Sequence, residues 1–194
     1  SEFKKKHRMN LERISLKKMK NWTYTNEEIF DNRKKIFKIE SYKILTDFRE
    51  VTQWSQPLVS DFHKGLNVLF IKKSNNIKNY LCQIILEPGY KIPKFTSSIM
   101  LKNLNKKYFL KSFLNQNKIK PKKKLIDVTN SDEGGRFNNN QSQNIAYEIN
   151  GSSILERQNY IWISHNQMLE LLKKRLLTIE LRNLFGLLNI EDLK

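Results

Sequence analysis

Two apolar runs joined by a short polar turn constrain the fold of this chain more than any other feature. The runs span residues 66–73 and 79–87, and the tripeptide Ser74-Asn75-Asn76 follows the first run. Serine and asparagine accept the backbone conformations of tight turns, so two strand-length apolar runs joined in this way indicate a β-hairpin. Pro88-Gly89 ends the second run, because proline cannot donate to a sheet ladder. We therefore expect a sheet built around this hairpin.

Other segments extend this sheet. Phe37 and Ile39 alternate with charged residues, which is typical of a half-buried strand. We expect four more strands, at residues 96–102, 125–128, 145–149 and 160–163. Residues 130–144 are polar throughout and contain Gly134-Gly135, and we expect a long loop there.

Helical patterns appear between the strands and at the C-terminal end. Tyr108, Phe109 and Phe113 indicate a helix in the middle of the chain. Ser164 and Gln167 have the spacing of a capping box, which predicts a helix start. A last amphipathic helix is predicted by apolar residues at i, i+3, i+4 and i+7, namely Leu181, Leu184, Phe185 and Leu188. The fold class is therefore α+β, a mostly antiparallel sheet with packed helices and a C-terminal helical segment.

The chain divides into a basic N-terminal segment, residues 1–21, and a single domain, residues 22–194. Leu11 and Ile14 in the N-terminal segment have loosely helical spacing, so we expect a short amphipathic segment there. Hydrophobic residues make up 39% of the chain, which is enough to form a core and argues against wholesale disorder.

Composition also bounds the location and the chemistry. No apolar stretch approaches the roughly 18 residues of a membrane span, and no apolar region follows the basic N-terminus as in a secretory signal. We therefore expect a cytoplasmic protein without membrane contact. Cys82 is the single cysteine, which excludes an internal disulfide and a cysteine-based zinc site. It lies in an apolar run, where an inert buried thiol is the simplest interpretation.

The chain is strongly basic. It has 36 lysines and arginines against 19 aspartates and glutamates, a net charge of +17. Such a surface attracts polyanions, nucleic acid among them. The chain is also rich in lysine, asparagine and isoleucine, as an AT-rich coding sequence would give. We favour a solvated basic surface over a dedicated nucleic-acid site, because charge alone produces mainly non-specific binding.

Four motifs combine polar groups with tryptophan, proline or glycine. The Arg49 motif spans residues 49–57, and the Glu87 motif spans residues 83–89. If residues 79–87 form a strand, Gln83 and Glu87 share one of its faces and could line a polar pocket. The Gly-Gly motif spans residues 131–137, and the C-terminal motif runs from Trp162 through the capped helix to Glu180 and Arg182. Each motif can also be interpreted as purely structural. Trp54 can be a core aromatic, and Gln83 and Glu87 can lie on an exposed sheet face. Residues 131–137 can form a surface turn, and Glu180 and Arg182 can lie on the solvated side of a helix.

Taken together, the four motifs resemble the family of sugar 2,3-dehydratases, which act on nucleoside-diphosphate 4-keto-6-deoxyhexoses in deoxysugar pathways. The first motif reads R-E-V-x-x-W-x-Q-P and the second Q-x-x-x-E-P-G. The third reads S-D-E-G-G-R-F, in which Asp132 replaces a glutamate, and the fourth includes Tyr160-x-Trp162, Gln167-Met168 and Glu180-x-Arg182. The likeness extends from about Trp22 to Leu188, and the joint match in order is far more specific than any one piece.

The resemblance implies a Nudix-like fold and a carbon-oxygen lyase that removes water across C2 and C3 of the sugar without a redox cofactor. The resemblance locates a site without assigning roles within it; our own hypothesis has Glu133 as the first choice for the base, Glu87 as the second, and Gln83 as a hydrogen-bond donor. The substrate-binding residues of this hypothesis are Arg49, Trp54, Gln56, Ser131, Arg136 and Arg182. Arginine suits the diphosphate because a guanidinium grips phosphate oxygens bidentately. The acidic Nudix box is missing, which argues against a metal-dependent pyrophosphohydrolase, and we expect neither a metal nor another cofactor.

Two departures keep other functions open. Members of the family usually carry two modules in a chain where this one has a single module, which predicts a homodimer. Met100 stands where the family has a glutamine in P-T-V-Q. These departures favour a second hypothesis, a non-catalytic or altered-reaction module that binds a nucleotide sugar. The third hypothesis, a nucleic-acid-binding protein, is favoured only by charge and predicts steep salt dependence. A ketoreductase would act downstream of a dehydratase.

Overall fold

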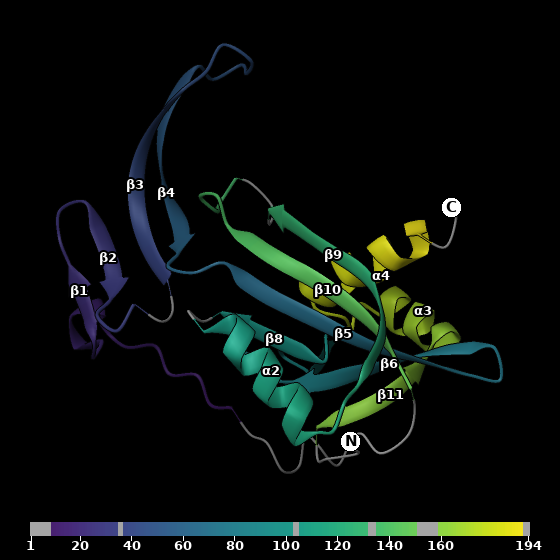
Figure 1. Cartoon of the computed structure of the whole chain (residues 1–194). Helices are drawn as coiled ribbons and strands as arrows, with labels where there is room; N and C mark the ends of the chain where they lie inside the picture. Colours follow the sequence, from purple (N-terminus) through teal and green to yellow (C-terminus); the bar gives the residue numbers. More distant parts are fainter. Residues whose placement is uncertain (1–8, 35–36, 103–104, 132–134, 151–158, 192–194) are drawn as a thin grey trace.

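A computed structural model describes residues 9–34, 37–102, 105–131, 135–150 and 159–191. A seven-stranded sheet forms the centre of the molecule. Its strands are β5 (Gly65–Ser74), β6 (Ile77–Ile85), β7 (Lys94–Thr96), β8 (Ile99–Lys102), β9 (Pro121–Ser131), β10 (Gln141–Ile149) and β11 (Tyr160–Ser164). The order is β11-β6-β5-β10-β9, with β7 paired to β6 and β8 to β5 (Figure 1). Only β5 and β10 run parallel; the other pairs are antiparallel.

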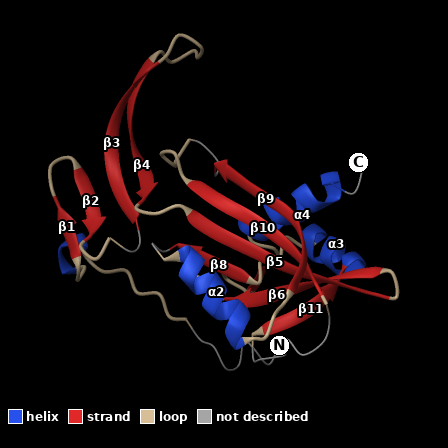
Figure 2. Cartoon of the chain, in the orientation of Figure 1, coloured by secondary structure: helices blue, strands red, loops and turns tan. Residues whose placement is uncertain are grey.

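Helices cover both faces of this sheet. They are α2 (Lys106–Gln116), α3 (His165–Lys173) and α4 (Ile179–Glu191). One core cluster joins Leu66, Val68 and Phe70 of β5 to side chains of α2. The other joins Leu69 and Ile71 to α3 and α4. Because neighbouring residues of a strand point to opposite faces, α2 packs on one face and α3 and α4 on the other (Figure 2).

A second sheet stands beside the first. It contains β1 (Trp22–Tyr24), β2 (Glu28–Asp31), β3 (Phe37–Leu45) and β4 (Gln53–Asp61), in that order. Strand β2 pairs with β3 only at residues 38–40, so the outer part of β3 and β4 is a two-stranded ribbon that arches away from the central sheet (Figure 1). Proline at position 57 is compatible with β4 because the strand lies at the edge of its sheet.

The β5–β6 hairpin predicted from the sequence is confirmed. Ser74 pairs with Ile77, so Asn75 and Asn76 form a two-residue turn. Both asparagines have positive φ, 50° and 60°. A tight hairpin turn of the primed type requires this backbone conformation, and asparagine adopts it more readily than most residues do.

The other edge of β5 is shared by two strands. Residues 65–68 pair with β8, and residues 70–74 pair with β6. Ser98 lies where the two strands meet, with a fully buried side chain. Its Oγ accepts a hydrogen bond from the Phe70 amide at 2.9 Å and donates one to the Leu81 carbonyl at 2.5 Å. This hydroxyl therefore replaces the ladder bonds that are lost where β6 separates from β5.

Several strand boundaries differ from the predictions, most clearly at residues 96–102 and 130–144. The single strand expected at 96–102 is divided into β7 and β8, because Ser97 and Ser98 lie at the change of partner. The expected loop 130–144 is too long. Strand β9 continues to Ser131 and β10 begins at Gln141, with polar residues such as Asn130 and Ser142 paired across the ladder. Backbone pairing stabilises these strand ends whatever the polarity of their side chains.

The amphipathic segment expected in the N-terminal segment is wrong for the described residues 9–20. A short 3₁₀ turn, η1 (Leu16–Lys18), is the regular structure that these residues form. Leu11 and Ile14 are 70% and 49% exposed, so they pack on no core.

The α+β class and the predicted helices are confirmed. The Ser164 side chain accepts from the Gln167 amide, and the Gln167 side chain accepts from the Ser164 amide, which completes the capping box of α3. The interior residues of α4 pack against the core, among them Leu181, Leu184, Phe185 and Leu188. Within the described ranges, no helix combines the length and the apolar character needed to cross a bilayer. The division into residues 1–21 and 22–194, and the Nudix-like likeness, stay predictions.

Replacing Ser98 by alanine should destabilise the fold by about 2–4 kcal/mol, because a buried amide and a buried carbonyl both lose their partner. Chemical denaturation measures this as a lower midpoint. Ser55→Ala, at an exposed position of β4, is the matched control and should change stability by no more than about 0.5 kcal/mol. Equal midpoints for the two variants would show that Ser98 does not bridge the strands.

Candidate functional site

Parts of three motifs, together with Glu180 and Arg182 of the fourth, lie towards one end of the central sheet, whereas Trp162 and Gln167 lie towards its other end. Strand β5 starts at the first of these ends, and β10 starts there too because it is parallel to β5. Strands β6 and β9 run the opposite way, so both finish there. The Glu87 motif follows β6, the Gly-Gly motif follows β9, and the Arg49 motif lies on β4, which leads into β5.

Backbone contacts join β4, the strand that carries the end of the Arg49 motif, to the Gly-Gly motif. Val59 of β4 forms a parallel bridge with Phe137. The Val59 amide donates to the Arg136 carbonyl at 2.8 Å, and the Asn138 amide donates to the Val59 carbonyl at 2.9 Å. The structure thus brings together two segments that lie about eighty positions apart, as Gln56 and Gly135 illustrate with a direct hydrogen bond of 2.5 Å from Gln56 Nε2 to the Gly135 carbonyl.

Side chains continue this contact along the β3–β4 ribbon. The Trp54 indole Nε1 donates to Gln56 Oε1 at 2.7 Å, and the Arg49 guanidinium lies 5.7 Å from the centre of the Trp54 ring. Trp54 is half-buried, so it is not the core aromatic of the alternative interpretation. Arg49 and Trp54 line a cavity of about 590 Å³ near the end of the ribbon, together with Phe48 and Val51. This cavity offers an aromatic face and a guanidinium to a ligand.

The Glu87 motif meets the C-terminal motif on the α4 side of the sheet. Phe95 of β7 pairs with Ile84 of β6. The Phe95 amide donates to the Leu176 carbonyl, and its carbonyl accepts from the Thr178 amide, at 2.8 and 2.9 Å. These bonds hold the start of α4 against β7, which brings Glu180 near Glu87.

The environment of Glu87 changes its acidity. Burial raises the pKa of Glu87, the neighbouring carboxylate of Glu180 raises this pKa further, and Lys102 acts in the opposite direction. Burial also raises the pKa of Tyr90, as do Glu87 and Glu180, whereas Arg182 lowers it. Glu87, Tyr90, Lys102, Glu180 and Arg182 are therefore one electrostatic group, which we call the Glu87 group.

A carboxylate with a raised pKa is a stronger base than an ordinary one and, when protonated, keeps its proton to higher pH than an ordinary carboxyl group. The Tyr90 hydroxyl and the Arg182 guanidinium can donate hydrogen bonds to an oxyanion. The Glu87 group therefore has the residue types that proton abstraction next to a ketone needs.

Lys102 connects the two halves of the site. Its ammonium contacts Asp61 Oδ2 at 2.5 Å, and the Asp61 side chain is only 8% exposed. Asp61 ends β4, and its neighbour Ser60 accepts a hydrogen bond from the Asn138 side chain at 3.2 Å. One lysine is thus paired with the strand that carries the Arg49 motif while it acts electrostatically on Glu87.

Sequence reasoning missed Tyr90 and Lys102. Tyr90 directly follows the E-P-G sequence, so its position offered a signal. Lys102 had none, because it reaches Glu87 only through the pairing of β8 with β5.

Gln83 and Glu87 do not share a face. The shared face required a strand through residue 87, but β6 ends at Ile85. Gln83 pairs with Thr96 and Tyr160, and by alternation it lies on the side of Leu81, towards α2. Glu87 instead lies within electrostatic range of Glu180 on α4.

Other predicted site residues have different outcomes. Glu133 and Asp132 lie outside the described residues, and so does the side chain of Ser131, whose backbone pairs with Gln141 at the end of β9. The Arg136 side chain is exposed. Met100 Sδ accepts from the Thr96 hydroxyl at 3.4 Å, and Met100 shares the face of β8 with Lys102 by alternation.

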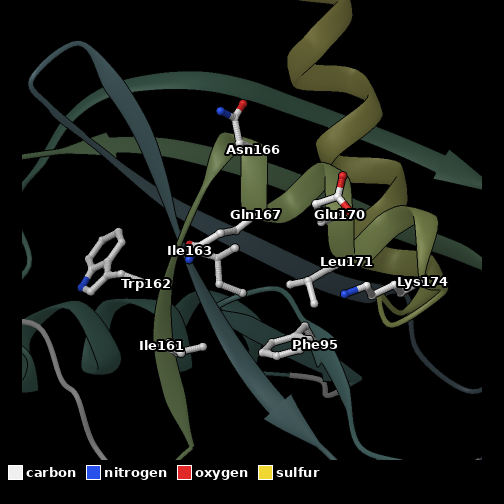
Figure 3. A pocket seen from close by; sticks show the side chains of 9 residues that line it. All are labelled: Phe95, Ile161, Trp162, Ile163, Asn166, Gln167, Glu170, Leu171 and Lys174. Carbon is white, nitrogen blue, oxygen red and sulfur yellow. The ribbon is translucent and has the colours of Figure 1, made fainter.

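A cavity of about 410 Å³ between β11 and α3 contains two residues of the C-terminal motif, Trp162 and Gln167 (Figure 3). Its walls are otherwise mainly apolar, with Ile161, Leu171 and Phe95. The Gln167 side chain is engaged in the capping box, and the Lys72 ammonium lies 4.1 Å from the centre of the Trp162 ring. These two residues therefore stabilise local structure.

Metal ligands are scattered in the part of the chain that the structure describes. No three histidine, cysteine, aspartate or glutamate side chains among those residues gather closely enough to hold an ion. Burial raises the pKa of the Cys82 thiol, which keeps the thiol protonated and unreactive, as expected for a core cysteine.

Comparison with known proteins agrees with the motifs. A family model described as NDP-hexose 2,3-dehydratase matches residues 1–188. A protein of Saccharopolyspora spinosa named dTDP-4-dehydro-6-deoxy-alpha-D-glucopyranose 2,3-dehydratase is 24% identical over 199 residues, 97% of this chain and 40% of the relative. A Streptomyces violaceoruber protein of the same name is 23% identical over 174 residues, 85% of this chain and 39% of the relative. The chain therefore spans about 40% of the length of these relatives.

Replacing Glu180 by glutamine should lower the pKa of Glu87 towards that of an ordinary glutamate, because one of the two causes of its rise is removed while burial stays. Carbon-detected NMR of the side-chain carboxyl groups across a pH series measures the change. Glu170→Gln, an exposed substitution on α3, is the control and should leave the pKa of Glu87 unchanged. A pKa of Glu87 that is the same in Glu180→Gln and in the parent would mean that the two carboxylates do not interact.

Proposed function

Because the chain belongs to the NDP-hexose 2,3-dehydratase family, we propose that it eliminates water across C2 and C3 of a nucleoside-diphosphate 4-keto-6-deoxyhexose. The observation that carries this proposal is the half-buried Glu87 carboxylate beside Glu180, Tyr90 and Arg182. The names of the relatives support a nucleotide-sugar substrate.

The reaction begins at the carbon next to the ketone. The C4 ketone acidifies the C3 hydrogen, so a carboxylate can take this proton and leave an enolate. The C2–O bond then breaks, and the leaving hydroxide takes a proton from an acid and departs as water. C3 carries a hydroxyl, so the resulting C2=C3 enol becomes a ketone. Electrons move only within the sugar, and no redox cofactor is consumed; a ketoreductase is the class of enzyme that would act on this diketone.

Two carboxylates are candidates for the base, Glu133 and Glu87. Glu133 follows from the Gly-Gly motif alone. For Glu87, the raised pKa favours proton abstraction once the group is ionised. Tyr90 is suited to protonate the leaving oxygen or to hold the enolate, and Arg182 adds positive charge nearby.

The remaining assignments concern binding. Trp54 offers its ring to the nucleobase, with Arg49 at the same cavity, and Arg136 offers an exposed guanidinium to the diphosphate. Gln56 already bonds Trp54 and Gly135, so its first task is to position the indole and the Gly-Gly motif. Gln83 lies on the α2 side of the sheet, so we place it second to Tyr90 as a donor to the sugar. Ser131 stays a prediction.

Exchange of the C3 hydrogen for solvent deuterium separates the two candidate bases. Glutamine keeps the size of glutamate but cannot take the proton, and general-base catalysis typically contributes about 10²- to 10⁴-fold. We expect Glu87→Gln to slow the exchange by roughly that factor while calorimetric nucleotide binding stays within about threefold of the parent. Since the carboxylate form is active, the parent rate should rise with pH through a pKa above that of ordinary glutamate, and Glu180→Gln should move the rise to lower pH.

Glu133→Gln and the surface variant Glu170→Gln complete the comparison. Slow exchange in Glu133→Gln alone would make Glu133 the base. A parent that binds the nucleotide sugar but exchanges no C3 hydrogen would support the alternative, a binding module without this reaction, which Met100 and its engaged sulfur favour.

We also propose that two copies of the chain pair, since relatives are more than twice as long and a two-fold dimer is the commonest way to join two equal modules. Light scattering at micromolar concentration should give about twice the 23.2 kDa of one chain. A single species at the mass of one chain under these conditions contradicts the dimer.

A further inference from the structure

A third cavity lies on the α2 side of the sheet, whereas Glu180 and Arg182 of the Glu87 group lie on α4, on the other side. It has a volume of about 630 Å³ and opens between the β4–β5 connection and the first turn of α2. Gln143 of β10 also lines it. Gln143 lies two residues before Ile145 on β10 and therefore on the same face, and Ile145 packs in the α2-side core. The cavity thus faces the side of the sheet opposite α4.

The wall of this cavity is basic. His63 and Lys64 come from the β4–β5 connection, and Lys106 and Lys107 are the first residues of α2. None of the eight residues that line it is acidic. Among the described residues, no carboxylate pairs with any of the three lysines, whereas Lys38, Lys102, Lys122, Lys124 and Lys173 all have such partners.

Lys106 is held in this environment by its neighbours. Lys106 is half-buried, and its ammonium donates to the Gly65 carbonyl at 3.3 Å. Burial and the nearby Lys64 both lower the pKa of Lys106, which means that the fold keeps two positive charges close together at some cost. An anion between them would replace that repulsion with attraction.

The shape and the remaining lining indicate the kind of anion. A simple halide would leave most of about 630 Å³ empty. Tyr108 is 77% exposed at the rim, so a larger ligand with an aromatic part can stack there. Ammonium groups and a histidine ring on two walls match the several oxygens of a phosphate group.

We propose that this cavity binds a phosphate or diphosphate group through Lys64, Lys106 and Lys107. The inference goes beyond the proposed dehydration and does not depend on it, because binding is measured without turnover. The bound phosphate group could belong to either of two molecules: the diphosphate of the nucleotide sugar, or a separate phosphorylated ligand.

Isothermal titration of the whole chain with inorganic pyrophosphate tests the proposal at constant ionic strength. We expect Lys64→Gln/Lys106→Gln to weaken binding roughly 10- to 100-fold, the range for lost charge-assisted hydrogen bonds. The control is Lys111→Gln/Lys123→Gln, two exposed lysines outside the cavity whose replacement lowers the net charge equally. It should bind as the parent does. Equal weakening in both double variants, or no binding by the parent, would overturn the proposal, since diffuse charge would then suffice.

Two further measurements keep the result clear. Thermal unfolding checks that the double variant folds; if Lys106→Gln destabilises the chain, Lys64→Gln alone carries the test and should still weaken binding at least about threefold. Titration with thymidine diphosphate separates the sources. Weakening in parallel with pyrophosphate identifies the substrate diphosphate, and unchanged nucleotide binding with lost pyrophosphate binding identifies a separate phosphorylated ligand.

Discussion

The shared edge of β5 governs the geometry of the whole molecule. Two strands cannot pair with the same edge at the same residues, so β8 takes residues 65–68 and β6 takes residues 70–74. Strand β6 then continues beside β7, which is bound to the start of α4 through Phe95. The divergence directs the end of β6 towards α4, which is why Glu87 lies beside Glu180. Ser98 compensates for the backbone hydrogen bonds that are lost where the strands diverge, because its hydroxyl bonds to both separated strands.

The lysines of the chain differ in whether a carboxylate neutralises their charge. Lys102 neutralises the largely buried Asp61 and thereby fixes the end of β4 against β8, so its charge belongs to the fold as well as to the Glu87 group. Lys64, Lys106 and Lys107 have no such carboxylate among the described residues. A net charge of +17 therefore describes at least two kinds of lysine, and only the second kind has charge left for a ligand. This distinction is invisible in composition.

Local signals predicted the elements that local interactions stabilise. The turn at Asn75-Asn76, the capping box at Ser164 and the apolar spacing of α4 each depend on residues within one or two turns of chain, and all three were predicted. The division of strand 96–102, the continuation of β9 to Ser131 and the pairing of β4 with Phe137 depend on partners far along the chain. The candidate site follows the same rule. Its motifs were visible in the sequence, but the grouping of Glu87 with Lys102 depends on the strand register. The prediction that Gln83 and Glu87 share a face was wrong because β6 ends two residues before Glu87.

Residues that match a family motif need not all contact substrate. The amide of Gln56 joins Trp54 to Gly135, and the amide of Gln167 closes the capping box of α3; both are explained by the fold alone. Glu87 is different, because burial and the neighbouring carboxylate of Glu180 both oppose its ionisation, and these two effects outweigh that of Lys102. Carboxylates with pKa values raised in this way gather at sites of proton transfer. Among the described residues of the four motifs, Glu87 is therefore the group whose surroundings are explained by chemistry better than by packing.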